Sequence, residues 1–158
     1  MKIEPYNEQQ ADAVVDLSLR AWAPVFVSLK EVLDPPVYED FYPEGWKVSQ
    51  EKSVRDTIGS AEMSTWVAME GDAVAGFMSI KMHSATFGEI YMIATDPNFQ
   101  KRGIASKMTG FALDWMKNKG VTIAMVDTGG DPGHGPARRT YEKAGFGLLP
   151  VARYFKKL

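Results

Sequence analysis

The sequence predicts an α/β domain with a mixed sheet (α+β in its antiparallel part): a meander of antiparallel strands, then a strand–helix–strand unit, with helices on both faces. Two strand-like runs flank a Gly71-Asp72 turn, the pattern of a β-hairpin. Further along, an amphipathic helix separates two more strand-like runs. The chain has 158 residues, 45% of them hydrophobic, which suits a single domain over residues 1–158 with one sizeable core.

The first half of the chain is predicted to be mainly helical. A short strand, KIEP, precedes a region from Glu8 to about Val32 in which apolar residues recur at helical spacing. Because proline is unfavourable inside a helix, we expect one or two helices there, with a break near Pro24. The stretch from Asp34 to Trp46 holds three prolines and four aromatic residues, which predicts an irregular loop. Another helix is expected over Gln50 to Ala61.

The second half is predicted to supply the rest of the sheet. Hairpin strands cover residues 64–70 and 73–82, and a further strand runs from Gly88 to Pro97, where Asp-Pro stops it. Together these runs form the antiparallel meander.

A strand–helix–strand unit follows the meander. Apolar residues at helical spacing predict an amphipathic helix from Gly103 to Lys119. The run VTIAMVD, residues 121–127, is almost continuously apolar, as expected for a strand covered on both faces. We read the C-terminal LLPVARYFKKL as a last strand, with Pro150 near its start or at a sheet edge.

Composition excludes several classes of function. A net charge of −2 and a pI near 5.7 argue against nucleic acid as the main partner, which would favour a basic face. The absence of cysteine excludes disulfides, thiolate catalysis and cysteine zinc sites. It also fits the reducing cytoplasm, and no stretch approaches the roughly 20 apolar residues of a membrane span. We therefore expect a cytoplasmic protein with no membrane partner.

The best candidate for a phosphate site is DPNFQKRGIASKM, residues 96–108. A strand ends there and a long helix begins, so free backbone N–H groups and the positive end of the helix dipole face outward. Gly103 and Ala105 are small enough for a diphosphate to approach the backbone. The alternative is an ordinary helix start with a solvated basic pair. The glycine-rich VDTGGDPGHGPARRTYEKAGF, residues 126–146, matches neither the P-loop nor the dinucleotide-binding pattern.

The motif Gln100-x-x-Gly103-x-Ala105 and the later ARRTYEKAGF resemble those of the GCN5-related N-acetyltransferase (GNAT) family, and the close resemblance covers about Phe87 to Phe146. It implies the GNAT fold and acetyl-coenzyme A as acetyl donor. The motif loop would hold the coenzyme's pyrophosphate, through Gln100 and the amides of Lys101, Arg102, Gly103, Ile104, Ala105 and Ser106. The backbone of Ile93 and Ala94, with Met92 adjacent, would hold the thioester carbonyl and the pantetheine arm.

Two residues are candidates for acid–base chemistry. An alkyl ammonium must lose a proton before it attacks, and by resemblance Glu89 is the general base; alternatively it is an exposed strand carboxylate, with a water chain as base. A tyrosine with a pKa of about 10 can protonate a leaving thiolate, and Tyr141 of the TYEKAGF motif maps onto the family's acid. Its alternative role is that of a core aromatic.

The remaining assignments are looser. His134 stands where many family members have an asparagine that contacts the pantetheine arm; it contacts coenzyme or is an exposed loop histidine. Trp22, Phe26, Tyr38 and Phe41 line an acceptor cleft or pin a loop to the core. We expect no metal, and Asp127, Asp131 and His134 make an incomplete zinc set. The predicted reaction acetylates a primary amine of a small molecule, peptide or protein, with a homodimer possible; the alternative is a non-catalytic acyl-coenzyme A sensor.

Overall fold

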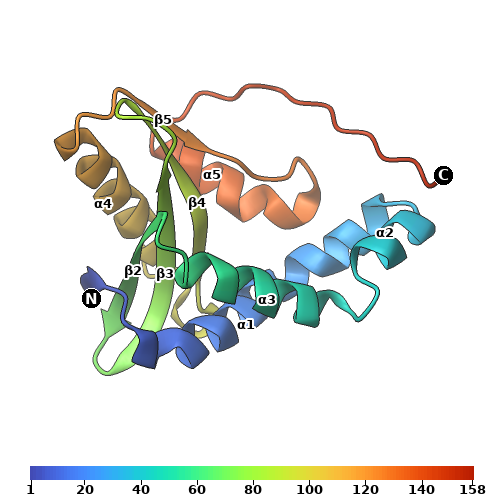
Figure 1. The fold of residues 1–158 in the computed structure, drawn as a ribbon, viewed down its shortest axis with the longest axis horizontal. Helices are drawn as coiled ribbons and strands as arrows, with labels where there is room; N and C mark the ends of the chain where they lie inside the picture. Colours follow the sequence, from blue (N-terminus) through green and yellow to red (C-terminus); the bar gives the residue numbers. More distant parts are fainter.

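A computed structural model describes residues 1–158. Its five strands form one sheet in the order β1–β2–β3–β4–β5 (Figure 1). The first four are antiparallel neighbours, whereas β5 lies parallel to β4. The mixed sheet predicted from the sequence is therefore confirmed. The strands are β1 (Lys2–Pro5), β2 (Met63–Glu70), β3 (Ala73–Met82), β4 (Phe87–Thr95) and β5 (Ile123–Val126).

The helices cover both faces of this sheet, with α1 and α3 on one side and α4 on the other (Figure 1). No helix is both long enough and apolar enough to cross a membrane. The α-helices are α1 (Ala11–Val32), α2 (Pro35–Phe41), α3 (Trp46–Ile58), α4 (Ile104–Asn118) and α5 (Gly135–Lys143), and three short 3₁₀ helices are η1 (Glu8–Gln10), η2 (Pro97–Phe99) and η3 (Pro132–His134).

Two apolar clusters, one on each face, form the core. On one face Met108 and Met116 of α4 pack against strand residues such as Ile80. On the other, Leu17 of α1 belongs to the cluster that contains Phe77 of β3. All five side chains are at most 1% exposed, and burying each one stabilises the fold by roughly 1.5–3 kcal/mol. The sheet is thus packed between helices on both of its faces, as predicted from the sequence.

Three helical predictions were wrong in detail. Helix α1 continues through Pro24, which lies on the exposed side, where water can donate a hydrogen bond to the carbonyl that proline leaves without its N–H donor. The expected loop after Asp34 contains α2, because its prolines occupy the first turn, where a helix needs no N–H donor. Helix α3 begins at Trp46 rather than Gln50.

The predicted last strand was also wrong. Residues 147–158 have no regular structure, and Leu148, Leu149 and Val151 are each more than 70% exposed. From the end of α5 the tail runs across to α2 (Figure 1), where Phe155 packs on Phe41 and Lys157 pairs with Asp40. Its apolar residues find no sheet face to bury against, and Pro150 cannot donate to a strand ladder.

Candidate functional site

The anion loop, residues 96–103, leaves β4 through a buried anchor. Asp96 is 3% exposed. Its carboxylate accepts hydrogen bonds from Arg20 Nη2 at 2.5 Å and from the Asn98 N–H at 2.9 Å. Burial raises the pKa of Asp96, but these hydrogen bonds more than offset that effect, so the pKa lies below its ordinary value. The start of the loop is thereby tied to α1, since Arg20 belongs to that helix.

The end of the anion loop exposes backbone donors. Lys101 and Gly103 both have left-handed backbones, with φ of 62° and 76°, a conformation found in loops whose N–H groups converge on an anion. No side chain caps the N-terminus of α4 at Gly103, and the loop residues Gln100 to Gly103 are exposed. The first-turn N–H groups of α4 therefore have no capping side chain and are free to meet a ligand.

One edge of β4 extends beyond its neighbour. Strand β5 pairs with β4 only from Phe87 to Ile90, whereas β4 itself continues to Thr95. The segment between them contains Met92, Ile93 and Ala94, the three residues predicted to hold a pantetheine arm. On the β5 side this segment has no strand partner, so its backbone groups can accept an extended ligand as a further strand would.

Tyr141 lies on α5 and is 9% exposed. Its ring packs edge-on against Phe146, with centroids 6.1 Å apart, and its hydroxyl makes no hydrogen bond within the protein. Burial raises the pKa of Tyr141 to about 12, so the hydroxyl is protonated at neutral pH. The side chain thus combines the packing of a core aromatic with the protonation state that an acid needs.

The glycine-rich loop before α5 folds around one carboxylate. Asp131 accepts hydrogen bonds from Ser28 Oγ at 2.6 Å and from the Gly133 N–H at 3.1 Å, and its other oxygen contacts Nδ1 of His134. These four residues form what we call the Asp131 junction. Burial raises the pKa of Asp131, but the hydrogen bonds from Ser28 and His134 more than offset this, and the pKa lies below its ordinary value.

The shape of the Asp131 junction explains the loop's glycines. A Cβ on Gly133 would lie 2.6 Å from Cβ of Ser28, and one on Gly129 would collide with Asp131 and His134. Arg138 holds the same turn, because its Nη1 donates to the carbonyl oxygens of Gly129 at 2.5 Å and Asp131 at 2.8 Å. The sequence analysis did not identify Ser28, because no local sequence pattern indicates its contact with Asp131, 103 residues further along the chain.

Glu89, the predicted base, is 9% exposed and hydrogen-bonded to His83 Nε2 at 2.7 Å. The alternative of an exposed strand carboxylate was therefore wrong. His83 is the second residue that the sequence analysis missed. Its position in the sequence could have indicated the contact, because His83 directly follows β3 and Glu89 lies in β4, the next strand of the same hairpin.

The four aromatic residues predicted near an acceptor separate into two places. Phe26 is 6% exposed and stacks on Trp46 at 4.5 Å, and Tyr38 and Phe41 join it through Tyr42. This aromatic cluster connects α1, α2 and the start of α3. Trp22 instead packs on Phe77 of the sheet, at 6.3 Å. Within the cluster Phe41 is the most exposed residue, at 43%.

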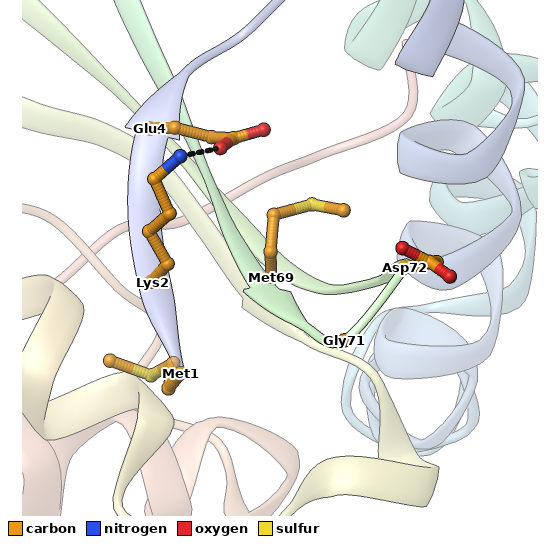
Figure 2. A pocket seen from close by; sticks show the side chains of 6 residues that line it. All are labelled: Met1, Lys2, Glu4, Met69, Gly71 and Asp72. Carbon is orange, nitrogen blue, oxygen red and sulfur yellow. Dashed lines mark ion pairs between the residues drawn. The ribbon is translucent and has the colours of Figure 1, made fainter.

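A surface hollow of about 430 Å³ lies on the β1 edge of the sheet, opposite the β5 edge (Figure 2). Within it Lys2 and Glu4 form an ion pair of 2.8 Å. It is open to solvent and contains none of the residues described above, so we assign it no role. Six residues line it: Met1, Lys2, Glu4, Met69, Gly71 and Asp72. No three His, Asp or Glu side chains converge anywhere as metal ligands would.

Comparison with known proteins agrees with the fold. The model of the acetyltransferase (GNAT) family matches residues 35–146. The uncharacterized N-acetyltransferase YsnE of Bacillus subtilis is 29% identical over 100 residues, which cover 63% of this chain and 66% of that protein. The mycothiol acetyltransferase of Beutenbergia cavernae is 37% identical over 84 residues, which cover 52% of this chain but 27% of that protein.

Among solved structures, the PaiA N-acetyltransferase of Thermoplasma acidophilum, in complex with coenzyme A, superposes with a TM-score of 0.69 at 13% sequence identity. The superposition covers 96% of this chain and 92% of that chain. This similarity covers a larger share of the chain than either sequence relative does. With the family match over most of its length and this shared fold, the chain belongs to the GNAT acetyltransferase family.

Proposed function

We propose that the protein is an N-acetyltransferase that moves an acetyl group from acetyl-coenzyme A to a primary amine of a small molecule, peptide or protein. The observation that carries this proposal is the continuity of two free backbone surfaces: the edge of β4 that β5 leaves unpaired, and the uncapped N-terminus of α4 that follows it. An extended ligand with a diphosphate at one end fits this arrangement: its chain would pair with the free backbone of β4, and its diphosphate would bind the N–H groups at the start of α4. Because the chain lacks cysteine, we place the activity in the cytoplasm.

In this proposal the coenzyme's diphosphate lies on the amides of residues 101–106, with Lys101 and Arg102 adding positive charge. The pantetheine arm follows Met92 to Ala94 and pairs with their backbone. His134 then meets the arm through Nε2, since its Nδ1 is engaged by Asp131. The Asp131 junction would fix the ring's orientation, as a hydrogen-bonded partner does for other functional histidines.

The proposed chemistry is direct attack. Glu89 takes a proton from the acceptor ammonium, so that an N–H bond breaks and the neutral amine can attack the thioester carbonyl. The new C–N bond forms as the C–S bond breaks, and the leaving sulfur takes the proton of the Tyr141 hydroxyl. The nitrogen, which carries one proton too many after the attack, releases it to water, and Tyr141 regains a proton from water. A hydroxyl with a pKa of about 12 keeps its proton across the neutral range, so the proton is present when the sulfur leaves.

A test of the function follows free thiol while the protein is incubated with acetyl-coenzyme A and a panel of primary amines. We expect thiol release that depends on the amine, with an acetylated product of matching amount by mass spectrometry. Tight coenzyme binding without turnover on any amine would favour the alternative, a non-catalytic acyl-coenzyme A sensor. The buried, protonated Tyr141 favours catalysis, because a sensor has no need of an acid for the sulfur.

A further inference from the structure

The pairing of Glu89 with His83 is an unusual arrangement for a carboxylate in the middle of a sheet. The Glu89 side chain is 11% exposed, and its single side-chain hydrogen bond is to Nε2 of His83, at 2.7 Å. The imidazole is 32% exposed and stacks on Phe87, with centroids 5.0 Å apart and planes 28° from parallel. One side of the histidine therefore faces solvent, while the other holds the carboxylate.

The other charged neighbour does not compete for this carboxylate. Lys81 lies directly opposite Glu89 in the β3–β4 register, where a lysine and a glutamate would ordinarily pair. Its ammonium lies instead over the ring of Tyr91, 5.9 Å from the centroid, and it makes no ion pair with Glu89. On the parallel neighbour β5, the residue opposite Glu89 is the uncharged Met125.

We propose that His83 is a positioning residue for Glu89: its Nε2–H holds one carboxylate oxygen, so that the second oxygen faces the acceptor amine. This inference rests on the proposed function of Glu89 as base. A glutamate without such a partner samples several side-chain conformers. A general base must lie within hydrogen-bond reach of the proton that it removes, so fixing its orientation raises the fraction of productive complexes.

Stacking on Phe87 gives the histidine its own fixed orientation. The ring is held face-on by Phe87 and edge-on by Glu89, and the hairpin turn beneath it is closed by the His83 N–H, which donates to the Phe87 carbonyl at 2.9 Å. Both the neutral Nε2–H tautomer and the charged imidazolium donate from Nε2, so either state can serve the carboxylate.

The test compares four variants, two of which carry Glu89→Gln, by steady-state kinetics on the acceptor found in the amine panel. We expect His83→Ala to lower kcat about 10- to 100-fold, the range seen when supporting partners of functional groups are removed, with the KM for acetyl-coenzyme A within about twofold of the parent value. His83→Gln, which keeps an N–H donor near the position of Nε2, should recover most of the loss. In a Glu89→Gln background, His83→Ala should cause no further loss.

Ser84→Ala is the matched control. Ser84 Oγ accepts from the N–H groups of Thr86 and Phe87 in the same turn without touching the pair. If it lowers kcat as much as His83→Ala does, or if His83→Ala is equally damaging with and without Glu89, the effect belongs to the shape of the hairpin and the inference is overturned. If Tyr141→Phe lowers kcat and Glu89→Gln does not, the proposed acetyl transfer is still supported. The proposed roles of Glu89 and His83 are then both wrong.

A measurement without turnover separates this inference from the proposed reaction. The chain has two histidines, so ¹⁵N imidazole spectra recorded with and without His134→Asn assign both rings. We expect a protonated Nε2 on His83 that becomes a mixture of tautomers in Glu89→Ala. An unprotonated Nε2 on His83 in the unmodified protein would overturn the inference even if the amine is acetylated.

Discussion

At the scale of single residues, burial of Tyr141 affects both its packing and its protonation state. The same desolvation that places its ring among apolar neighbours disfavours the phenolate and raises its pKa to about 12. Across the neutral range the proton therefore stays on the hydroxyl. The contacts that make Tyr141 a core aromatic therefore also keep it protonated, as the proposed role of acid requires.

Tyr141→Phe removes only the hydroxyl and keeps the ring. We expect kcat to fall about 100-fold or more, in the range for a lost general acid, with the affinity for acetyl-coenzyme A unchanged within about twofold. Stopped-time thiol release and calorimetric titration with coenzyme measure the two quantities. Tyr154→Phe, at a 91% exposed tail residue, is the matched control, and an equal loss there would count against the assignment of Tyr141.

Gly103 illustrates a residue needed for its backbone. A Cβ at this position would touch nothing within 4 Å, but its φ of 76° is one that β-branched residues avoid. Gly103→Val should therefore raise the KM for acetyl-coenzyme A about tenfold or more while the protein stays folded. Gly110→Ala in α4, also with open space around it and with an ordinary helical backbone, should leave KM as it is. An unchanged KM in Gly103→Val would refute the diphosphate assignment.

At the scale of elements, two carboxylates tie separate pieces of the site to α1. Asp96 joins the anion loop to Arg20, and Asp131 joins the loop before α5 to Ser28. Helix α1 is therefore the common support of the site's two loops. Both contacts come from one 22-residue helix that continues through its internal proline.

These two carboxylates predict how stability changes with acid. Their folded-state pKa values lie below the ordinary 3.8, so the stabilisation is present above about pH 4 and is lost as the pH falls through the lowered values. Urea unfolding between pH 7 and pH 3 should show this loss. Asp96→Asn should lower the unfolding free energy at pH 7 by about 2 kcal/mol. In this variant the unfolding free energy should also fall less steeply as the pH is lowered toward 3. If the unfolding free energy of Asp96→Asn fell with acid as steeply as that of the parent protein, the role given to Asp96 would be contradicted.

At the scale of the whole molecule, the C-terminal tail contributes little to the fold. Its apolar side chains are mostly exposed, and its links to the body are one aromatic contact and one surface ion pair at α2. We expect removal of residues 148–158 to change Tm by about 2 °C or less. Leu17→Ala, in the core, should cost about 2–5 kcal/mol and serves as the positive control. A truncated protein that loses as much as Leu17→Ala would show that the tail is structural.

The order of strands and helices could be predicted because hydrophobic periodicity is a local property. The anion loop was predictable for a similar reason, since strand, small residues and helix follow one another directly. The helix over Pro35–Phe41 was missed because proline at a first turn and proline in a loop look alike in sequence. Ser28 and His83 were missed because each acquires its role from a partner that only the folded sheet and helices bring close.

The Asp131 junction has a consequence for how the protein can change over evolutionary time. Ser28 sits on the same helix as Phe26 of the aromatic cluster, yet it is locked to the loop that orients α5. Under the proposed function, mutational drift toward new amines is therefore constrained along α1, where each change risks misaligning the proposed acid, Tyr141. It is freer on α2, whose Phe41 is bound only to neighbouring rings and the tail. Selection for altered acceptors should accumulate substitutions in Pro35–Phe41 before it reaches Ser28.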